Sequence, residues 1–290
     1  MASRSRARSP VLERSLTRPD RKVEVVNGGT TGYSTDQEYL FYQQEGVRYA
    51  PRIVVLFFYY NDVHYNAHAG YRRPKLDKPV FLVDAGKLVL RNVPVPSPAP
   101  RGASAPPDDP TPAPSGLALT AWIQDRLRGG APEAYAWGAR AGLWREPRIE
   151  EVPQELKVYK RRDLAATRDS WERTALILQA LAERVEADGA RFLVAYVPSL
   201  MEVNDRAWTL TRLQYGLDDA QWDRRAVWNQ LQRIAERRFA VLDLTPALRS
   251  ADHGAWGGPY YPRDAHWNAR GHEVAAREVE ASLRGQGLLP

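Results

Sequence analysis

The segment YYPRDAHWNARGH, residues 260–272, contains two of the five histidines of the chain, with an aspartate two positions before the first. An imidazole can take a proton from a hydroxyl group near neutral pH, and a carboxylate beside it can hold the ring in the required tautomer. Asp264 and His266 are therefore candidates for a catalytic base and its orienting acid. The alternative interpretation is a helix-entry loop in which the aspartate caps a helix and the histidine is merely exposed.

Three of the remaining histidines have other interpretations. His272 falls within a helical pattern, and we expect it to pack rather than to act as a second base. His64 and His68 have the i, i+4 spacing of a helical metal pair, but no third ligand is evident near them. We therefore expect them to lie on a solvated face, and we predict no metal site.

The elements that must position Asp264 and His266 alternate along the chain. Apolar, β-branched runs predict strands, and amphipathic stretches predict helices. The predicted strands are residues 23–26, 53–59, 190–198 and 239–244, and the predicted helices are residues 35–46, 167–188, 222–238 and 269–284. This order predicts an α/β fold, a three-layer α/β/α sandwich with a mostly parallel, flavodoxin-like sheet. Ligands of such sheets bind beyond the carboxyl ends of the strands.

Other segments add detail to this pattern. Thr35 and Glu38 have the spacing of a capping box and predict the start of the first helix. Residues 80–83 and 88–90 predict a small hairpin. The proline-rich stretch 94–116 predicts an extended, mobile insertion within a single domain spanning residues 1–290. Residues 117–145 look helical but have no clear apolar stripe.

The composition limits the classes of function. The 290 residues are 43% hydrophobic, enough to build the core of one large domain or two small ones. The net charge is 41 − 35 = +6, but the basic residues are scattered among acidic ones, which argues against nucleic-acid binding. The absence of cysteine excludes disulfides and thiolate catalysis. No run is long enough for a membrane span, and the first residues lack the apolar part of an export signal.

Three motifs, in this order, resemble the SGNH (GDSL-type) hydrolase family over about residues 12–285. VVNGGTTG resembles the second block of the family, which implies that Gly32 donates its backbone N–H to an oxyanion. FYYNDV resembles the third block, which implies that Asn61 donates its side-chain amide to the same oxyanion. PRDAHWNARGH resembles the last block, in the Asp-x-His-Trp variant of a branch that includes alginate acetylation proteins, and implies that His266 is the base and Asp264 its partner.

The resemblance implies a serine esterase or acyltransferase that needs no metal or organic cofactor. The Asp-x-His-Trp variant favours O-acetyl groups of carbohydrates as substrate, with lipid or small-molecule esters as the close alternative. Trp267, Asn27 and Tyr33 are possible residues of the substrate cleft; Trp267 could equally anchor its loop, and Asn27 is expected to tie its loop back to the sheet. The family resemblance also suggests a periplasmic, secreted or membrane-anchored location.

The nucleophile is missing from this pattern. The first block of the family, a Gly-Asp-Ser at the end of a central strand, would precede residues 23–26 and is not present. Ser3, Ser5 and Ser9 are candidates by proximity only, because a nucleophile needs a fixed turn to aim its oxygen. We expect the natural protein to begin upstream of Met1. Without the central strand, we also expect unpaired backbone groups and an open apolar slot in the sheet.

Two other classes of function stay open. A non-catalytic descendant of the same fold would use the cleft to bind a glycan without cleaving it. A nucleotide-binding protein would use NGGTTGYST, residues 27–35, as its phosphate loop, but this loop lacks a lysine and a full dinucleotide fingerprint.

Overall fold

The computed structural model of the chain describes most of the residues that the sequence analysis singled out. The described residues are 10–17, 19, 22–68, 78–95, 122–124, 126–127, 130–131, 134–135, 137–138, 141–144, 152–161, 167–236, 238–253, 258–261 and 264–289, with the backbone alone at 10, 11 and 264.

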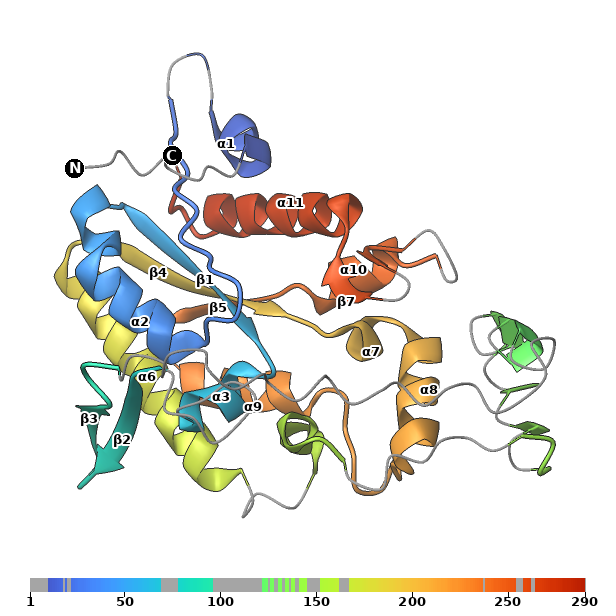
Figure 1. Cartoon of the computed structure of the whole chain (residues 1–290). Helices are drawn as coiled ribbons and strands as arrows, with labels where there is room; N and C mark the ends of the chain where they lie inside the picture. The colour runs from blue at the N-terminus through green and yellow to red at the C-terminus, as the bar shows by residue number, and fades with distance from the viewer. Residues whose placement is uncertain are drawn as a thin grey trace, which may run out of the picture.

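The regular elements alternate between helices and strands (Figure 1). In chain order they are α1 (Pro10–Leu16), α2 (Thr35–Gln44), η1 (Gly46–Tyr49), β1 (Ile53–Tyr59), α3 (Asp62–Ala67), β2 (Val80–Asp84), β3 (Lys87–Arg91), η2 (Gln154–Tyr159), α6 (Arg168–Ala187), β4 (Arg191–Val197), α7 (Leu200–Val203), α8 (Asp205–Tyr215), α9 (Ala226–Ala235), β5 (Ala240–Asp243), α10 (Thr245–Ala251), β6 (Tyr260–Tyr261), β7 (Asp264–Trp267) and α11 (Ala269–Gly285).

The main sheet has the strand order β1-β4-β5, and both pairings are parallel. Leu56 lies opposite Val194, and Ala195 lies opposite Leu242. All three strands therefore end at one side of the sheet, which we call the carboxyl edge. β1 is an edge strand, and no other described strand pairs with the side of Ile53–Tyr59 that faces away from β4; we call this side the open edge of β1.

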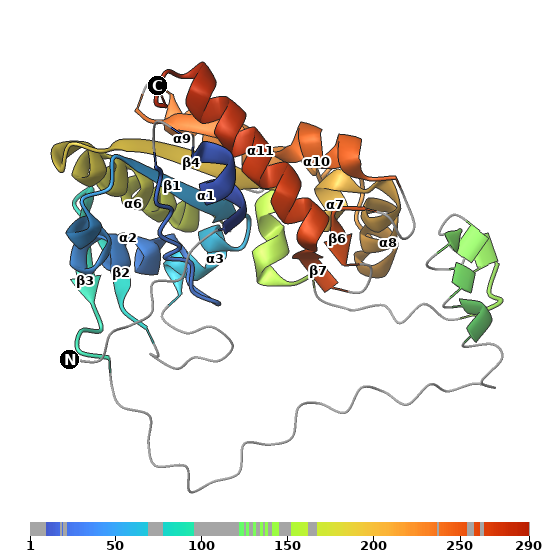
Figure 2. The same cartoon turned by 90° about the horizontal axis from the view of Figure 1, so that it is seen from above.

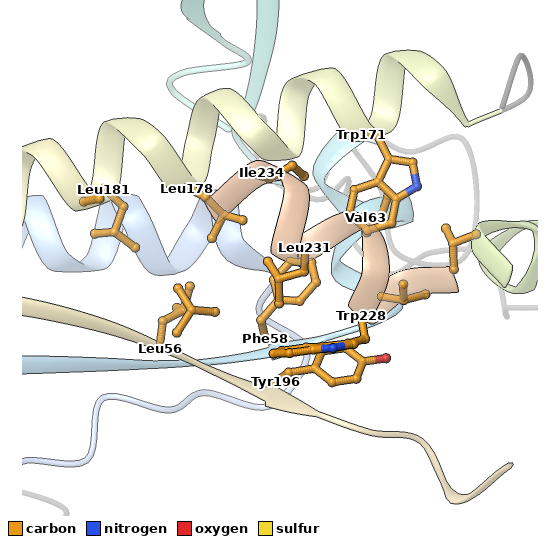
Figure 3. Packing of buried hydrophobic residues seen from close by; sticks show 14 of the residues in the cluster. Leu56, Phe58, Val63, Trp171, Leu178, Leu181, Tyr196, Trp228, Leu231 and Ile234 are labelled. Carbon is orange, nitrogen blue, oxygen red and sulfur yellow. The ribbon is translucent and has the colours of Figure 1, made fainter. Parts of the chain in front are cut away.

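Side chains of β1 and β4 lie in two hydrophobic cores, one on each face of the sheet, because successive residues of a strand point to opposite faces. Leu56, Phe58 and Tyr196 pack against α6 and α9 on one face, as Figure 3 shows in detail. Leu193 and Ala195 pack against α10 and α11 on the other face. Figure 1 shows the same helices on either side of the strands. The predicted three-layer α/β/α sandwich is thereby confirmed.

Most predicted elements are confirmed with small changes in their bounds. The strands predicted at 53–59, 190–198 and 239–244 are β1, β4 and β5, and the helices predicted at 167–188, 222–238 and 269–284 are α6, α9 and α11. The predicted hairpin is the antiparallel pair β2 and β3. We did not predict α7, α8 and α10, nor the short antiparallel pair β6 and β7.

The prediction of a strand at residues 23–26 is wrong. These residues form no strand, and Val26 makes only an isolated bridge. Side chains of the segment around α1 satisfy part of this backbone: the N–H of Val23 donates to Thr17 Oγ1 at 3.2 Å, and that of Val25 donates to Glu13 Oε2 at 3.1 Å. An apolar run becomes a strand only where a neighbouring backbone is available to pair with it, and here side chains take that place.

The predicted capping box at the start of α2 is also wrong. Ser34, not Thr35, is the N-cap residue, and its hydroxyl donates to Asp36 Oδ1 at 2.7 Å instead of capping the helix. Glu38 is directed into the interior, where its Oε2 is buried. Tertiary burial of this first turn therefore overrides the local capping pattern.

Two predictions fall largely outside the described residues. These are the insertion at 94–116 and the helical stretch at 117–145, of which only short pieces are described. That the chain forms a single domain stays a prediction. Among the helices of the described residues, none is both long and apolar enough to cross a bilayer.

Replacement of Gly271 by alanine should destabilise the protein by about 2 kcal/mol, because overpacking of a tight contact strains the backbone. A Cβ at this position in the first turn of α11 would lie 2.3 Å from the carbonyl oxygen of Pro259 and 2.9 Å from Cβ of Trp267. Gly285, at the other end of the same helix, has open space around it. Urea unfolding should show a loss for Gly271→Ala and no loss for Gly285→Ala; equal effects would contradict the packing argument.

Candidate active site at the carboxyl edge

Three segments follow the strands at the carboxyl edge of the sheet. β1 leads into Asn61 and α3, β4 leads into Pro198, Ser199 and α7, and β5 leads into α10. The β6–β7 pair lies at the same edge. The ring of Trp267 on β7 meets that of Phe57 on β1 edge to face, with centroids 6.4 Å apart, and the Tyr260 hydroxyl donates to the carbonyl oxygen of Pro198 at 2.6 Å.

The predicted base and its partner lie on β7. His266 is exposed, and Asp264 lies two positions before it on the same strand. The sequence led us to expect a helix-entry loop as the alternative, whereas this stretch pairs with β6 as a strand and α11 starts only at Ala269. Asn268 is the N-cap of α11, since its Oδ1 accepts from the N–H of Gly271 at 3.2 Å. Asp264 is therefore not the cap of this helix.

Asn61 lies directly before α3, two residues after β1. Its side chain makes no capping hydrogen bond to the helix. The next residue, Asp62, is buried, and its Oδ2 accepts from the backbone N–H of Tyr59 at 2.8 Å. The turn after β1 is thus closed by Asp62, and the amide of Asn61 has no role in closing it.

The loop before α2 contains the other predicted oxyanion donor. Gly32 has φ of 80°, a left-handed conformation that favours glycine. Tyr33 is 39% exposed, and its N–H donates to the carbonyl oxygen of Thr30 at 3.1 Å. Asn27 does not tie the loop to the sheet, as the sequence led us to expect: its Oδ1 accepts from Gly29 N–H at 2.9 Å, within the loop itself.

The buried side chain of Asn66 joins the first turn of α2, which follows this loop, to α3. The Oδ1 atom of Asn66, on α3, accepts from the backbone N–H of Asp36 at 3.0 Å, and its Nδ2 donates to Thr174 Oγ1 on α6 at 3.1 Å. Lys78 adds an ion pair to Asp36 at 2.6 Å and a hydrogen bond to Ser34 at 2.9 Å. The segments of Gly32 and Asn61 are therefore linked by buried hydrogen bonds that the sequence analysis missed.

A second buried polar cluster lies where β4 ends. Glu202 is fully buried and accepts from Tyr196 Oη at 2.7 Å, Tyr159 Oη at 2.8 Å and the N–H of Ser199 at 2.8 Å. Burial raises the pKa of the Glu202 carboxyl to about 7, although these hydrogen bonds oppose the shift. The serine-x-x-glutamate spacing after an apolar strand is the signal that could have found this capping box.

Ser199 is not a suitable nucleophile, although it follows a strand at the correct edge. It is buried, and its hydroxyl donates to Glu202 Oε2 at 3.0 Å. Tyr159 Oη also lies within hydrogen-bonding distance of Ser199 Oγ, at 3.1 Å. The nucleophile stays unknown, because Ser3, Ser5 and Ser9 lie outside the described residues.

The other histidines contact neighbouring rings. His64 and His68 stack with centroids 4.0 Å apart, and Nδ1 of His68 lies 2.6 Å from the carbonyl oxygen of His64. His68 is exposed, as expected, whereas His64 is half-buried, and burial, with a smaller effect of His68, lowers the pKa of His64 to about 4. No cluster of three ligands that could hold a metal occurs in the part of the chain that the structure describes. His272 is exposed and packs edge to face against Trp267.

Comparison with known families supports the resemblance that was based on the motifs. Residues 157–289 match the model of the SGNH hydrolase-like domain of the acetyltransferase AlgX. This part of the chain is SGNH hydrolase-like. The match confirms the resemblance and supports an SGNH-type protein that acts on acyl groups. The matched region includes β7 with Asp264 and His266, and it does not include Gly32 or Asn61. No curated protein and no solved structure matches the chain.

Buried Asp62 should make the protein less stable as the pH rises. Burial raises its folded-state pKa from 3.8 to about 7. Between these two pKa values the folded state therefore holds a proton on Asp62, whereas the unfolded state has already released it. The stabilisation that this difference gives to the folded state is present at pH 4 and is lost as the pH passes 7. The loss should be on the order of 2 to 4 kcal/mol.

Urea unfolding between pH 4 and 8 measures this effect. Asp62→Asn keeps an oxygen that can accept from Tyr59 N–H and should reduce the pH dependence, leaving the part that buried Glu202 contributes. Asp84→Asn, in the exposed turn of the β2–β3 hairpin, is the control for loss of one carboxyl group. A wild-type stability that rises over this range would contradict the assignment to Asp62.

Proposed function

We propose that this protein is an SGNH-type ester hydrolase or acyltransferase with its active site at the carboxyl edge of the sheet. The observation that carries the proposal is the packing of the β6–β7 pair across the ends of β1 and β4, through Trp267 on Phe57 and Tyr260 on Pro198. His266 belongs to that pair, and Asn61 follows β1 directly. The buried link through Asn66 connects α3 to the segment after Gly32.

The proposed reaction proceeds through an acyl-enzyme. A serine oxygen attacks the ester carbonyl while His266 takes its proton, and Asp264 holds the imidazole in the correct tautomer. The N–H of Gly32 and the amide of Asn61 donate to the oxyanion of the tetrahedral intermediate. His266 then returns the proton to the departing alkoxide. Water, or the hydroxyl of an acceptor, attacks the acyl-enzyme by the same route in reverse.

The serine that this reaction needs would come from a strand paired with the open edge of β1. Two features favour this arrangement. β1 is an edge strand of the main sheet, as described, and its Phe57 is 42% exposed. A strand that added to this edge would cover Phe57 and end beside Asn61. The nucleophile would then face His266 across the end of β1.

Carbohydrate O-acetyl groups are the substrate class that we propose. Trp267 and Tyr33 provide aromatic surface beside the segments that hold the catalytic groups, and sugar rings stack on such surfaces. Lipid or small-molecule esters are the second candidate, favoured by the exposed apolar ring of Phe57. A glycan-binding protein without catalysis is the alternative of a different class, because the chain as given contains no serine in the expected block.

His266→Ala should abolish hydrolysis of 4-nitrophenyl acetate by the protein expressed from its own gene, including whatever precedes residue 1. The loss should be about a thousandfold or more, because no other group can take the serine proton. His253→Ala, at another exposed histidine, is the matched control and should keep full activity. A fluorophosphonate probe on the wild-type protein identifies the nucleophilic serine by peptide mass. Glycan binding with neither probe labelling nor acetate release would favour the non-catalytic alternative.

Asn61→Ala should lower turnover by about a hundredfold or more, because one oxyanion donor contributes roughly 3 to 4 kcal/mol to the transition state. Stability should change little, since Asn61 makes no capping hydrogen bond. Asn229→Ala, at an exposed position of α9, is the control. Steady-state kinetics and thermal unfolding measure the two effects separately. A fall in stability without a fall in turnover would mean that Asn61 is only a turn residue.

A further inference from the structure

The phenol of Tyr260 connects the β6–β7 pair to the main sheet. Its hydroxyl donates to the carbonyl oxygen of Pro198, directly after β4, at 2.6 Å. Tyr260 is buried, and its ring packs with Leu193, Leu244 and Leu248. We propose that Tyr260 is a positioning residue that fixes where the strand of His266 lies relative to the carboxyl edge. This inference rests on the proposed function of His266 as the base.

The acceptor of this hydrogen bond is itself held in place. Ser199, the residue after Pro198, donates both its N–H and its hydroxyl to Glu202 Oε2, at 2.8 and 3.0 Å. Glu202 in turn accepts from Tyr196, on β4. The carbonyl oxygen of Pro198 therefore lies at a fixed point relative to the sheet, and a donor that binds it takes its position from the sheet.

The donor is tied to the histidine strand by backbone pairing. Tyr260 lies opposite Trp267, the neighbour of His266. The side-chain amide of Asn268 closes this same end of the pair, because its Nδ2 donates to the carbonyl oxygens of Gly258 at 2.8 Å and Tyr260 at 3.2 Å. A shift of the Tyr260 backbone would therefore shift the backbone beside His266 as well. Figure 2 shows β6 and β7 beside the first turns of α11.

The second contact of this pair with the main sheet is less specific. Trp267 and Phe57 meet edge to face at 6.4 Å, a contact that tolerates sliding of one ring over the other. A short hydrogen bond from a buried phenol has a defined direction and distance. Burial also raises the pKa of the Tyr260 hydroxyl, so it keeps its proton and remains a donor. Tyr260 is thus a directional contact between the histidine strand and the sheet.

Tyr260→Phe removes one oxygen atom and tests the proposal. In the protein expressed from its own gene, kcat for 4-nitrophenyl acetate should fall about tenfold to a hundredfold with KM changed less than about twofold, because misplacement of a base lowers the rate of the step that it serves. Tyr261→Phe removes the same atom from the next, exposed residue and should leave kcat unchanged. 4-Aminophenylalanine at position 260 restores an N–H donor and should recover most of the lost kcat.

Two further measurements separate positioning from general stability. Leu283→Ala removes a buried apolar side chain near the C-terminal end of α11, outside the contacts of the hairpin, and should lower the melting temperature without a comparable loss of kcat. The NMR cross-peak of the His266 ring should move in Tyr260→Phe and stay in place in Tyr261→Phe, whether or not the protein hydrolyses the ester.

The outcomes distinguish this inference from the proposed function. A wild-type protein without esterase activity overturns the proposed function and this inference with it. An active wild type whose Tyr260→Phe variant keeps its kcat and its His266 cross-peak overturns the positioning role alone. A loss of kcat in Tyr260→Phe that only matches that of Leu283→Ala also overturns it, because both would then act through stability.

Discussion

The parallel pairing of β1 with β4 is the constraint on which the rest of the molecule depends. Both strands are apolar on both faces, so each must be covered by helices above and below, and the three layers follow. Parallel pairing also makes both strands end at the same edge. Asn61 follows β1 at that edge, and the β6–β7 pair with His266 packs against it. The site is therefore a consequence of strand direction as much as of the residues in it.

Polar groups are buried directly beneath this edge, where an apolar core would be expected. Asp62 and Glu202 each accept backbone N–H groups at the end of a strand, and burial raises the pKa of each carboxyl group to about 7. A buried carboxyl group is costly unless hydrogen bonds satisfy it, so these turns have few alternative conformations. Rigid turns are what a catalytic site needs, because donors and base must be held in place before the substrate arrives.

The open edge of β1 gives the sheet an unusual asymmetry. The opposite side of β1 is fully paired with β4, whereas Phe57 remains 42% exposed although it lies in the middle of an apolar run. Edge strands with unpaired backbone groups invite pairing with another strand. The same edge is where the resemblance to SGNH hydrolases requires the strand of the nucleophile.

The sequence predicted the order of layers and three of the main strands, because long apolar runs and amphipathic helices are local patterns. It also indicated Asp264, His266, Asn61 and Gly32 through short motifs. It was wrong about residues 23–26, since whether an apolar run becomes a strand depends on a partner far away in the chain. The alternative interpretation of residues 264–267 as a helix-entry loop is excluded, because this stretch is a strand paired with β6.

Only the tertiary structure decided what holds these groups together. The bonds from Asn66 to Asp36 and from Tyr260 to Pro198 join residues 30 and 62 positions apart, and no local pattern distinguishes these two side chains from other polar residues. The sequence by itself determined which chemical groups are present and which elements carry them. Their mutual positions depend on contacts between distant segments, which arise only when the layers pack.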